Sequence, residues 1–135
     1  MKRGMRITGD ATWGVGLISI IMAAYNAEKT IEQAINSVLN QTYSNFELLV
    51  VDDCSKDGTA RIIKKFMSKD SRVRLISNAK NSGVSYTRKH GLDEAKGSWI
   101  AILDSDDAWM PEKLEKQIAR QKQTSADLLF TGSAF

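Results

Sequence analysis

The sequence has very little of three residues on which many folds and active sites depend. It contains one cysteine, one proline and one histidine in 135 residues. A single cysteine, Cys54, cannot form an internal disulfide, so nothing indicates an oxidising compartment. The single histidine, His90, lacks the companions that a zinc site or a catalytic triad requires, and we expect it to have a surface or packing role.

Long apolar runs and blocks of like charge are also missing. The uncharged, mostly apolar segment at residues 15–26 is shorter than the roughly 20 apolar residues of a spanning helix, and the N-terminus does not resemble a signal peptide. The sequence has nineteen Lys and Arg residues and sixteen Asp and Glu residues, which gives a net charge of +3. We therefore expect no transmembrane segment and no nucleic-acid partner, although the small positive surplus favours phosphorylated ligands.

The length and composition predict one domain. A chain of 135 residues with 42% hydrophobic residues can build one ordinary core but not two. Residues 1–14 have no clear periodicity, and we expect them to be a poorly ordered lead-in. The domain would then occupy residues 15–135.

Short apolar runs rich in β-branched residues alternate with segments whose apolar residues recur at helical spacing. Asn26 and Asp57 are suited to cap the first two helices, and Gly97 to end the third. The expected strands are 17–22, 46–51, 73–77, 99–103 and 128–131, and the expected helices are 27–40, 58–69, 84–95 and 111–123. This alternation predicts an α/β fold, with a Rossmann-like, mostly parallel sheet and helices on both faces.

Acidic residues follow two of the expected strands. Asp52 and Asp53 come after the second strand, and the fourth is followed by Asp104, Asp106 and Asp107. Ligands of parallel sheets bind beyond the carboxyl ends of the strands, where these side chains would converge. Carboxylates held that close repel one another unless a cation neutralises them, so the pattern favours Mn²⁺ or Mg²⁺ with oxygen ligands.

Acidic residues also terminate strands and cap helices for purely structural reasons. Capping is the favoured interpretation for Asp57, and for Asp52 a structural hydrogen bond is as favoured as a ligand contact. For Asp104 and Asp106 the metal interpretation is preferred, because two charges after an apolar strand contribute nothing to the fold.

Three strings resemble, in order and spacing, the family 2 glycosyltransferases of the GT-A fold. They are SIIMAAYN at 19–26, VVDDCSKDGT at 50–59 and LDSDD at 103–107. The intervening segments LNQT at 39–42 and NSGV at 81–84 agree as well. The resemblance covers the chain from residue 17 onward. It implies that the domain is the nucleotide-sugar-binding half of a GT-A fold.

The resemblance implies a role for each of five residues. Tyr25 would stack on or contact the nucleotide base, and Asp53 would accept a hydrogen bond from it. Asp104 would contact the ribose, Asp106 would ligate the Mn²⁺ or Mg²⁺ that bridges the two phosphates, and Arg88 would lie near the nucleotide. The donor would be a nucleotide-sugar, with UDP favoured because the family uses it often. Asp107 would have a supporting role only.

The resemblance also implies a catalytic general base well downstream of the metal motif. No acidic residue in 112–127 has a suitable context, so we expect the base beyond the C-terminus and the acceptor half to be absent. One hypothesis is therefore an inverting transferase acting on a carbohydrate or lipid-linked acceptor. The alternative is a metal-dependent nucleotide-sugar-binding fragment with no transfer activity. A phospho-receiver domain is disfavoured, because its acidic pair follows the first strand, where this chain has Tyr25 and Asn26.

The same resemblance bears on location and assembly. It implies a cytoplasmic protein, with peripheral association at the inner face of the membrane compatible with a lipid-linked acceptor. A half-domain without its acceptor lobe would expose apolar surface, which favours self-association as a homo-oligomer.

Overall fold

A computed structural model describes residues 16–124 of the chain. Its elements are, in chain order, β1 Ile18–Ala24, α1 Ile31–Leu39, β2 Phe46–Asp52, α2 Thr59–Met67, β3 Val73–Ser77, α3 Val84–Glu94, β4 Trp99–Ile102 and α4 Lys113–Thr124. The expected lead-in at 1–14 and the strand expected at 128–131 lie outside the described residues. The other predicted elements are all present, with ends that differ from the prediction by at most four residues.

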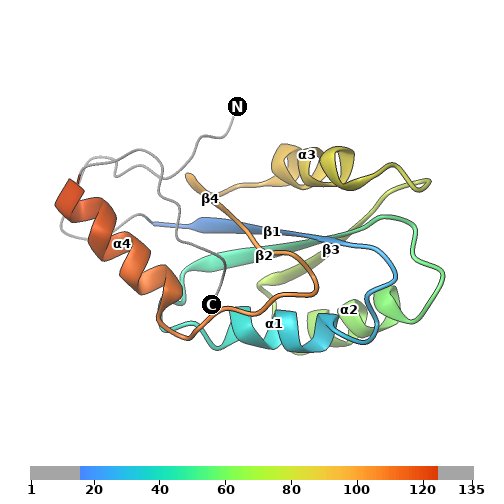
Figure 1. Ribbon diagram of the computed structural model, residues 1–135, viewed down its shortest axis with the longest axis horizontal. Coiled ribbons are helices and arrows are strands. Elements are labelled where there is room, and N and C mark those ends of the chain that lie inside the picture. Colours follow the sequence, from blue (N-terminus) through green and yellow to red (C-terminus); the bar gives the residue numbers. More distant parts are fainter. Residues whose placement is uncertain (1–15, 125–135) are drawn as a thin grey trace.

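The strands form a parallel sheet in the order β3-β2-β1-β4. Helix α3 covers one face, and α1 and α2 cover the other (Figure 1). This arrangement confirms the predicted α/β fold with helices on both faces. The chain moves outward from β1 to β3 and then returns to place β4 on the other side of β1. The strand order therefore reverses at β1, which is where ligands of such sheets bind.

Burial on both faces explains why the strands read as apolar runs. Every residue of β2 is buried, and so are all but one residue of β1. Helix α1 contributes a buried stripe at helical spacing, formed by Ile31, Ala34, Ile35 and Val38. None of the helices within residues 16–124 has the length and hydropathy that a membrane crossing requires.

Helix α3 approaches the other face of the sheet unusually closely, at Gly91. A Cβ atom at this position would lie 2.8 Å from Cγ2 of Ile21 and 3.0 Å from Cγ2 of Val51. Both methyl groups belong to central strands, so the absence of a side chain lets the helix backbone lie against them. This contact fixes the height of α3 above the sheet.

The predicted cap of α1 is wrong. Asn26 has a φ of 48° and precedes a turn, and the helix begins only at Ile31. The side chain of Asn26 instead accepts a hydrogen bond from the Lys56 N–H at 2.8 Å, which joins the loops after β1 and β2. Asparagine tolerates the left-handed region better than most residues do, which explains its presence at this turn.

The other two helix-end predictions also differ from the structure. The N-cap of α2 is Gly58 and not Asp57, but Asp57 lies one residue earlier and its carboxylate accepts a hydrogen bond from the Thr59 N–H at the start of the helix, at 3.0 Å. Gly97 does not end α3, because the helix stops at Glu94. Glycine instead allows the backbone before β4 to lie close to the backbone before β1, since a Cβ at position 97 would lie 2.7 Å from the carbonyl oxygen of Leu17.

Candidate functional site

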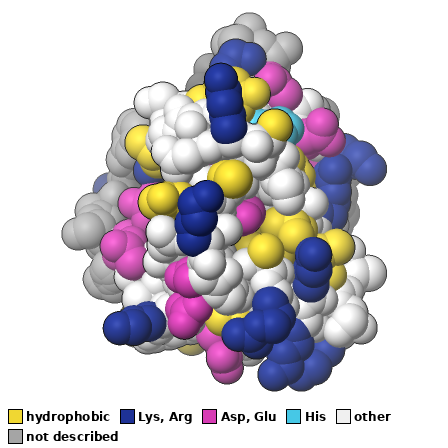
Figure 2. Space-filling model, turned by 90° about the vertical axis from the view of Figure 1, so that its right-hand side faces the viewer, with side chains coloured by type: hydrophobic (Ala, Val, Ile, Leu, Met, Phe, Trp, Pro, Cys, Tyr) yellow, Lys and Arg dark blue, Asp and Glu magenta, His cyan; other side chains and the backbone are white. Residues whose placement is uncertain are grey.

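The carboxyl ends of β1, β2 and β4 lie together at one end of the sheet. Backbone hydrogen bonds continue past the strands: the Asp53 N–H donates to the Ala24 carbonyl at 2.8 Å, and the Leu103 N–H donates to the Ile21 carbonyl at 3.1 Å. Figure 2 shows this end of the molecule, where acidic and basic side chains surround patches of apolar surface. The structure thus places the loops that carry the predicted site residues at one edge.

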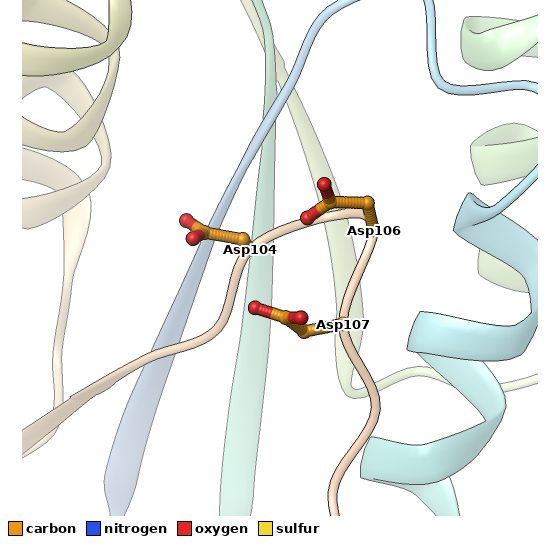
Figure 3. Close-up of side chains that lie close together, drawn as sticks. All are labelled: Asp104, Asp106 and Asp107. Atoms are coloured by element: carbon orange, nitrogen blue, oxygen red, sulfur yellow. The ribbon is translucent and has the colours of Figure 1, made fainter. Parts of the chain in front are cut away.

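Three of the acidic side chains form a cluster after β4. Asp104, Asp106 and Asp107 each offer a carboxylate oxygen, and these oxygens all lie within 4.8 Å of one another. A turn brings Asp107 back beside Asp104, closed by a 3.1 Å hydrogen bond from the Asp107 N–H to the Asp104 carbonyl. Figure 3 shows the carboxylates of Asp106 and Asp107 turned toward the side on which Asp104 lies. Asp107, for which the sequence predicted only a supporting role, is therefore a full member of the cluster.

The cluster concentrates negative charge that the fold itself does not use. Two unit charges about 4 Å apart repel by about 1 kcal/mol in water and by about 4 kcal/mol near a protein surface. Asp106 and Asp107 are exposed and have no ion-pair partner among the described residues. A bound cation would relieve this repulsion.

The donor set of the cluster fits a hard divalent cation. All the side-chain ligands would be carboxylate oxygens, which Mg²⁺ and Mn²⁺ prefer. Oxygens on opposite sides of an octahedral Mg²⁺ are about 4.2 Å apart, given Mg–O distances of about 2.1 Å. The 4.8 Å span of the cluster is slightly larger, and a small rotation of exposed side chains would close it.

Arg88 joins the cluster from helix α3. Its Nη2 lies 2.7 Å from Oδ1 of Asp104, and the two side chains are 39% and 48% exposed. The Nε atom of Arg88 is buried without a hydrogen-bond partner among the described residues. The guanidinium thus places one positive charge beside the three carboxylates, on the side of the sheet opposite α1.

Tyr25 follows β1 at the same edge and is 48% exposed. Its neighbour Asn26 anchors the backbone there, since the Asn26 N–H donates to Oγ of Ser55 at 2.9 Å. Asp52 in turn accepts hydrogen bonds from the N–H and the hydroxyl of Ser55. Asp52 therefore supports the loop, while the ring of Tyr25 is open to a planar ligand.

The carboxylate of Asp53 is buried and faces the loop that leads into α3. Its Oδ1 accepts hydrogen bonds from Asn78 Nδ2 at 2.9 Å and the Ser82 N–H at 2.7 Å. Its Oδ2 accepts from the Gly83 N–H at 2.9 Å and Asn81 Nδ2 at 3.2 Å. A carboxylate has about four acceptor positions, so these partners use its full capacity. A hydrogen bond from Asp53 to a base would have to replace one of them.

These hydrogen bonds also decide the charge state of Asp53. Burial raises the pKa of its carboxyl, but hydrogen bonds from Asn78, Ser82, Gly83 and Thr87 together outweigh burial. The pKa of Asp53 is therefore below its usual value, and the group is ionised at neutral pH.

Asn78 is a residue of this site that the sequence reasoning missed. It is buried after β3, and its amide nitrogen donates to Asp53 and, at 2.9 Å, to Oγ1 of Thr87. Its Oδ1 lies 2.7 Å from Nδ1 of His90, so Nδ1 carries the proton in this pair. His90 thus helps to orient the amide of Asn78, which donates to Asp53. The position of Asn78 at the carboxyl end of a strand is the signal that could have identified it.

Comparison with known proteins identifies one family. The sequence profile described as Glycosyl transferase family 2 matches residues 19–133. One relative, the UDP-Glc:α-D-GlcNAc-diphosphoundecaprenol β-1,3-glucosyltransferase WfgD of Escherichia coli, is 46% identical over 114 residues, which cover 84% of this chain and 44% of that protein. Another, the succinoglycan biosynthesis protein ExoO of Rhizobium meliloti, is 40% identical over 111 residues, which cover 82% of this chain and 31% of that protein.

Solved structures agree with this result. Staphylococcus aureus TarS in complex with UDP-GlcNAc is similar with a TM-score of 0.74 and 34% identity, over 78% of this chain and 31% of that chain. The mannosyltransferase PcManGT of Pyrobaculum calidifontis has a TM-score of 0.71 at 23% identity, over 89% of this chain and 35% of that chain, and shows the fold alone. The present chain spans less than half the length of these proteins.

Proposed function

The chain belongs to glycosyl transferase family 2, and we propose that it is the donor-binding half of an inverting glycosyltransferase. The donor is a UDP-sugar bound with Mn²⁺ or Mg²⁺, and the acceptor is a hydroxyl of a carbohydrate or lipid-linked saccharide. The observation that carries this proposal is the group of three carboxylates at the switch point of the sheet, with Arg88 bound to one of them.

Two comparisons support the choice of donor and acceptor. The name of the 46% identical E. coli relative gives UDP-Glc as its donor and a diphosphoundecaprenol-linked GlcNAc as its acceptor. TarS, 34% identical, was solved with UDP-GlcNAc. By analogy, we propose a UDP-sugar donor, a lipid-linked acceptor, and action in the cytoplasm at the inner face of the membrane.

Six side chains would contribute to donor binding. Tyr25 stacks on the uracil and Asp104 accepts hydrogen bonds from the ribose hydroxyls. Arg88 lies where it can donate to the diphosphate, and Asp106 would ligate the metal with help from Asp107. A bound divalent cation would stabilise the charge that develops on the leaving diphosphate, without proton transfer. Asp53 would contact the base only by exchanging one of its present partners.

A second candidate function is donor binding without transfer. Beyond Asp107, the acidic side chains of the described residues are Glu112 and Glu115, and Glu115 accepts a hydrogen bond from the Thr42 hydroxyl. Helix α4 leads away from the site (Figure 1). Neither of these two carboxylates therefore offers itself as a general base for an acceptor, which favours a role limited to donor binding for this stretch of chain.

The first experiment is isothermal titration of the 135-residue chain with UDP, with and without Mn²⁺. We expect Mn²⁺ to strengthen UDP binding, and Asp106→Asn to remove at least about tenfold of that gain, or about 1.4 kcal/mol. Asp107→Asn should have a smaller effect in the same direction. Asp93→Asn is the matched control, because Asp93 is exposed on α3 and pairs with Lys89. UDP binding that does not respond to Mn²⁺ would rule out the metal site.

The second experiment separates the two candidate functions. Sugar transfer and donor hydrolysis are measured for this chain and for a full-length family member. We expect donor binding by both and transfer only by the longer protein. Transfer by the 135-residue chain alone would contradict the prediction that the general base lies elsewhere.

A further inference from the structure

The loop that carries the aspartates is held at two points by the two ends of one helix. We call residues 103–112, between β4 and α4, the aspartate loop. At the start of α1, Oγ1 of Thr30 donates to the Ser105 carbonyl at 3.0 Å. Just past the end of α1, Nε2 of Gln41 donates to the Met110 carbonyl at 2.7 Å. Helix α1 thus spans the loop from one end to the other.

The first contact lies inside the carboxylate cluster. Ser105 is the residue between Asp104 and Asp106, so the hydrogen bond from Thr30 acts on the peptide that connects the two side chains. Thr30 precedes the first turn of α1, but its side chain caps no N–H of the helix. Its hydroxyl bonds most closely to the aspartate loop, since its other acceptor, the Ala27 carbonyl in the turn before α1, is farther away at 3.5 Å.

Through the second contact and two others, the side chain of Gln41 links α1, the aspartate loop and α4. Its side chain is buried, and besides Met110 it donates to the Ser37 carbonyl at 3.1 Å and accepts from the Leu114 N–H at 3.0 Å. The last carbonyls and the first N–H groups of a helix lack partners within the helix. Gln41 satisfies one of each, at the end of α1 and the start of α4, while it holds the loop between them.

We propose that Thr30 and Gln41 are positioning residues for the metal and diphosphate site. They fix the aspartate loop so that the carboxylates of Asp104, Asp106 and Asp107 remain within reach of one cation. Neither residue is expected to contact the ligand itself. The inference rests on the proposed function, because it assigns these residues to the site at which the nucleotide diphosphate would bind.

The test uses Thr30→Val, which keeps the shape of the side chain and removes the hydroxyl. UDP affinity is measured with and without Mn²⁺, together with amide hydrogen exchange at Ser105, Asp106 and Asp107. We expect a loss of about fivefold to tenfold in Mn²⁺-supported UDP affinity, a clearly smaller loss of Mn²⁺-free affinity through the ribose contact of Asp104, and faster exchange in the loop. Thr30→Ser, which keeps the hydroxyl, should restore both properties.

Ser37→Ala is the matched control, because the Ser37 hydroxyl donates to the Ala34 carbonyl within α1 and not to the loop. It should leave affinity and exchange unchanged. Gln41→Met is the second variant, and should speed exchange at the other end of the loop. If Thr30→Val should fail to fold, Thr30→Ala takes its place.

The possible results separate the inference from the function it rests on. If UDP binding to the unaltered chain does not depend on Mn²⁺, the proposed metal site fails, and exchange alone then decides whether Thr30 holds the loop. Unchanged exchange in folded Thr30→Val overturns the inference. Equal losses of UDP affinity with and without Mn²⁺ also overturn it, because they indicate a general effect on the fold.

Discussion

The guanidinium of Arg88 lies 2.7 Å from the carboxylate of Asp104, so helix α3 and the aspartate loop meet in an ion pair. Arg88 lies in the first half of α3, and Asp104 follows the end of β4. The ion pair joins them at the carboxyl end of the sheet. Both side chains are partly exposed, and pairs of this kind contribute about 0–1 kcal/mol to stability. The pair therefore matters more for the charge of the site than for the fold.

Replacing Arg88 should change the binding of metal and of nucleotide in opposite directions. Arg88→Met keeps the packing of the stem and removes the charge that offsets Asp104. We expect Mn²⁺ alone to bind up to about fivefold more tightly, because the cluster becomes more negative. UDP in the presence of Mn²⁺ should bind about tenfold more weakly, because a charged donor to the diphosphate is lost.

Both affinities for Arg88→Met can be measured by titration, with free Mn²⁺ followed by electron paramagnetic resonance. Lys89→Met is the control, since Lys89 is the next residue on α3 and pairs with Asp93 at 3.0 Å. A parallel loss of both affinities in Arg88→Met would show that the arginine supports the loop and does not contact the diphosphate.

Tyr25 provides a test of base stacking. The side chain is 48% exposed, so its removal should have little effect on the fold. We expect Tyr25→Ala to weaken UDP binding by about 1–3 kcal/mol and Tyr25→Phe to leave it nearly unchanged, because the aromatic face makes the contact. Tyr86→Ala, which removes a 55% exposed tyrosine of α3, is the control. Similar losses in Tyr25→Phe and Tyr25→Ala would instead assign the contact to the hydroxyl.

The sequence predicted the fold and the edge of the sheet better than it predicted individual contacts. Continuous apolar strands and helical stripes are local signals, so the elements and the convergence of Asp104 and Asp106 followed from them. The roles of Thr30, Gln41 and Asn78 depend on hydrogen bonds to residues distant in sequence, such as Ser105 and Met110. No local pattern encodes these partners; only for Asn78 does a sequence signal exist, in its position at the carboxyl end of a predicted strand.

Asn26 shows a related limitation, because here a local signal exists but a tertiary contact overrides it. Its residue type favours a helix cap, and the apolar pattern after it is helical. The backbone instead turns through the left-handed region, and the side chain bonds to the loop after β2. A tertiary contact has replaced the local one that its residue type favours, and α1 starts four residues later than predicted.

The hydrogen bonds of Asp53 predict a pH-dependent contribution to stability. Its pKa is lower in the folded chain than in the unfolded chain, so ionised Asp53 stabilises the fold above about pH 4, and this contribution is lost as the pH falls through the folded pKa. In Asp53→Asn, an NH₂ group replaces a carboxylate oxygen that accepts two hydrogen bonds, and an NH₂ group cannot accept them. We expect a loss of about 1–3 kcal/mol in the free energy of unfolding at pH 7.

The check for Asp53→Asn is urea denaturation at several pH values between 3 and 7. The difference between this variant and the unaltered chain should shrink as the pH falls below about 4. Asp93→Asn serves as the exposed control and should show little difference at any pH. A stability gap for Asp53→Asn that stays constant across this range would show that charge is not its cause.

Gly91 couples the packing of α3 to the position of Arg88, one turn earlier on the helix. Alanine favours helices by about 1 kcal/mol over glycine, but its Cβ would lie 2.8 Å from Ile21 and 3.0 Å from Val51. Both neighbours are β-branched and belong to central strands, so neither side chain can change its rotamer at a low energetic cost. Overpacking costs about 1–3 kcal/mol or more, and the steric cost should therefore exceed the propensity gain.

We expect Gly91→Ala to lower the melting temperature by several degrees, since about 1 kcal/mol corresponds to about 4 °C in a domain near this size. The helix can relieve the clash only by moving away from the sheet, which also draws Arg88 away from Asp104. UDP affinity in the presence of Mn²⁺ should fall as well. Ser85→Ala, at an exposed position of α3, should be neutral or stabilising. If Gly91→Ala were as stable as Ser85→Ala, the sheet would accommodate the methyl group, and the height of α3 would not be set at this contact.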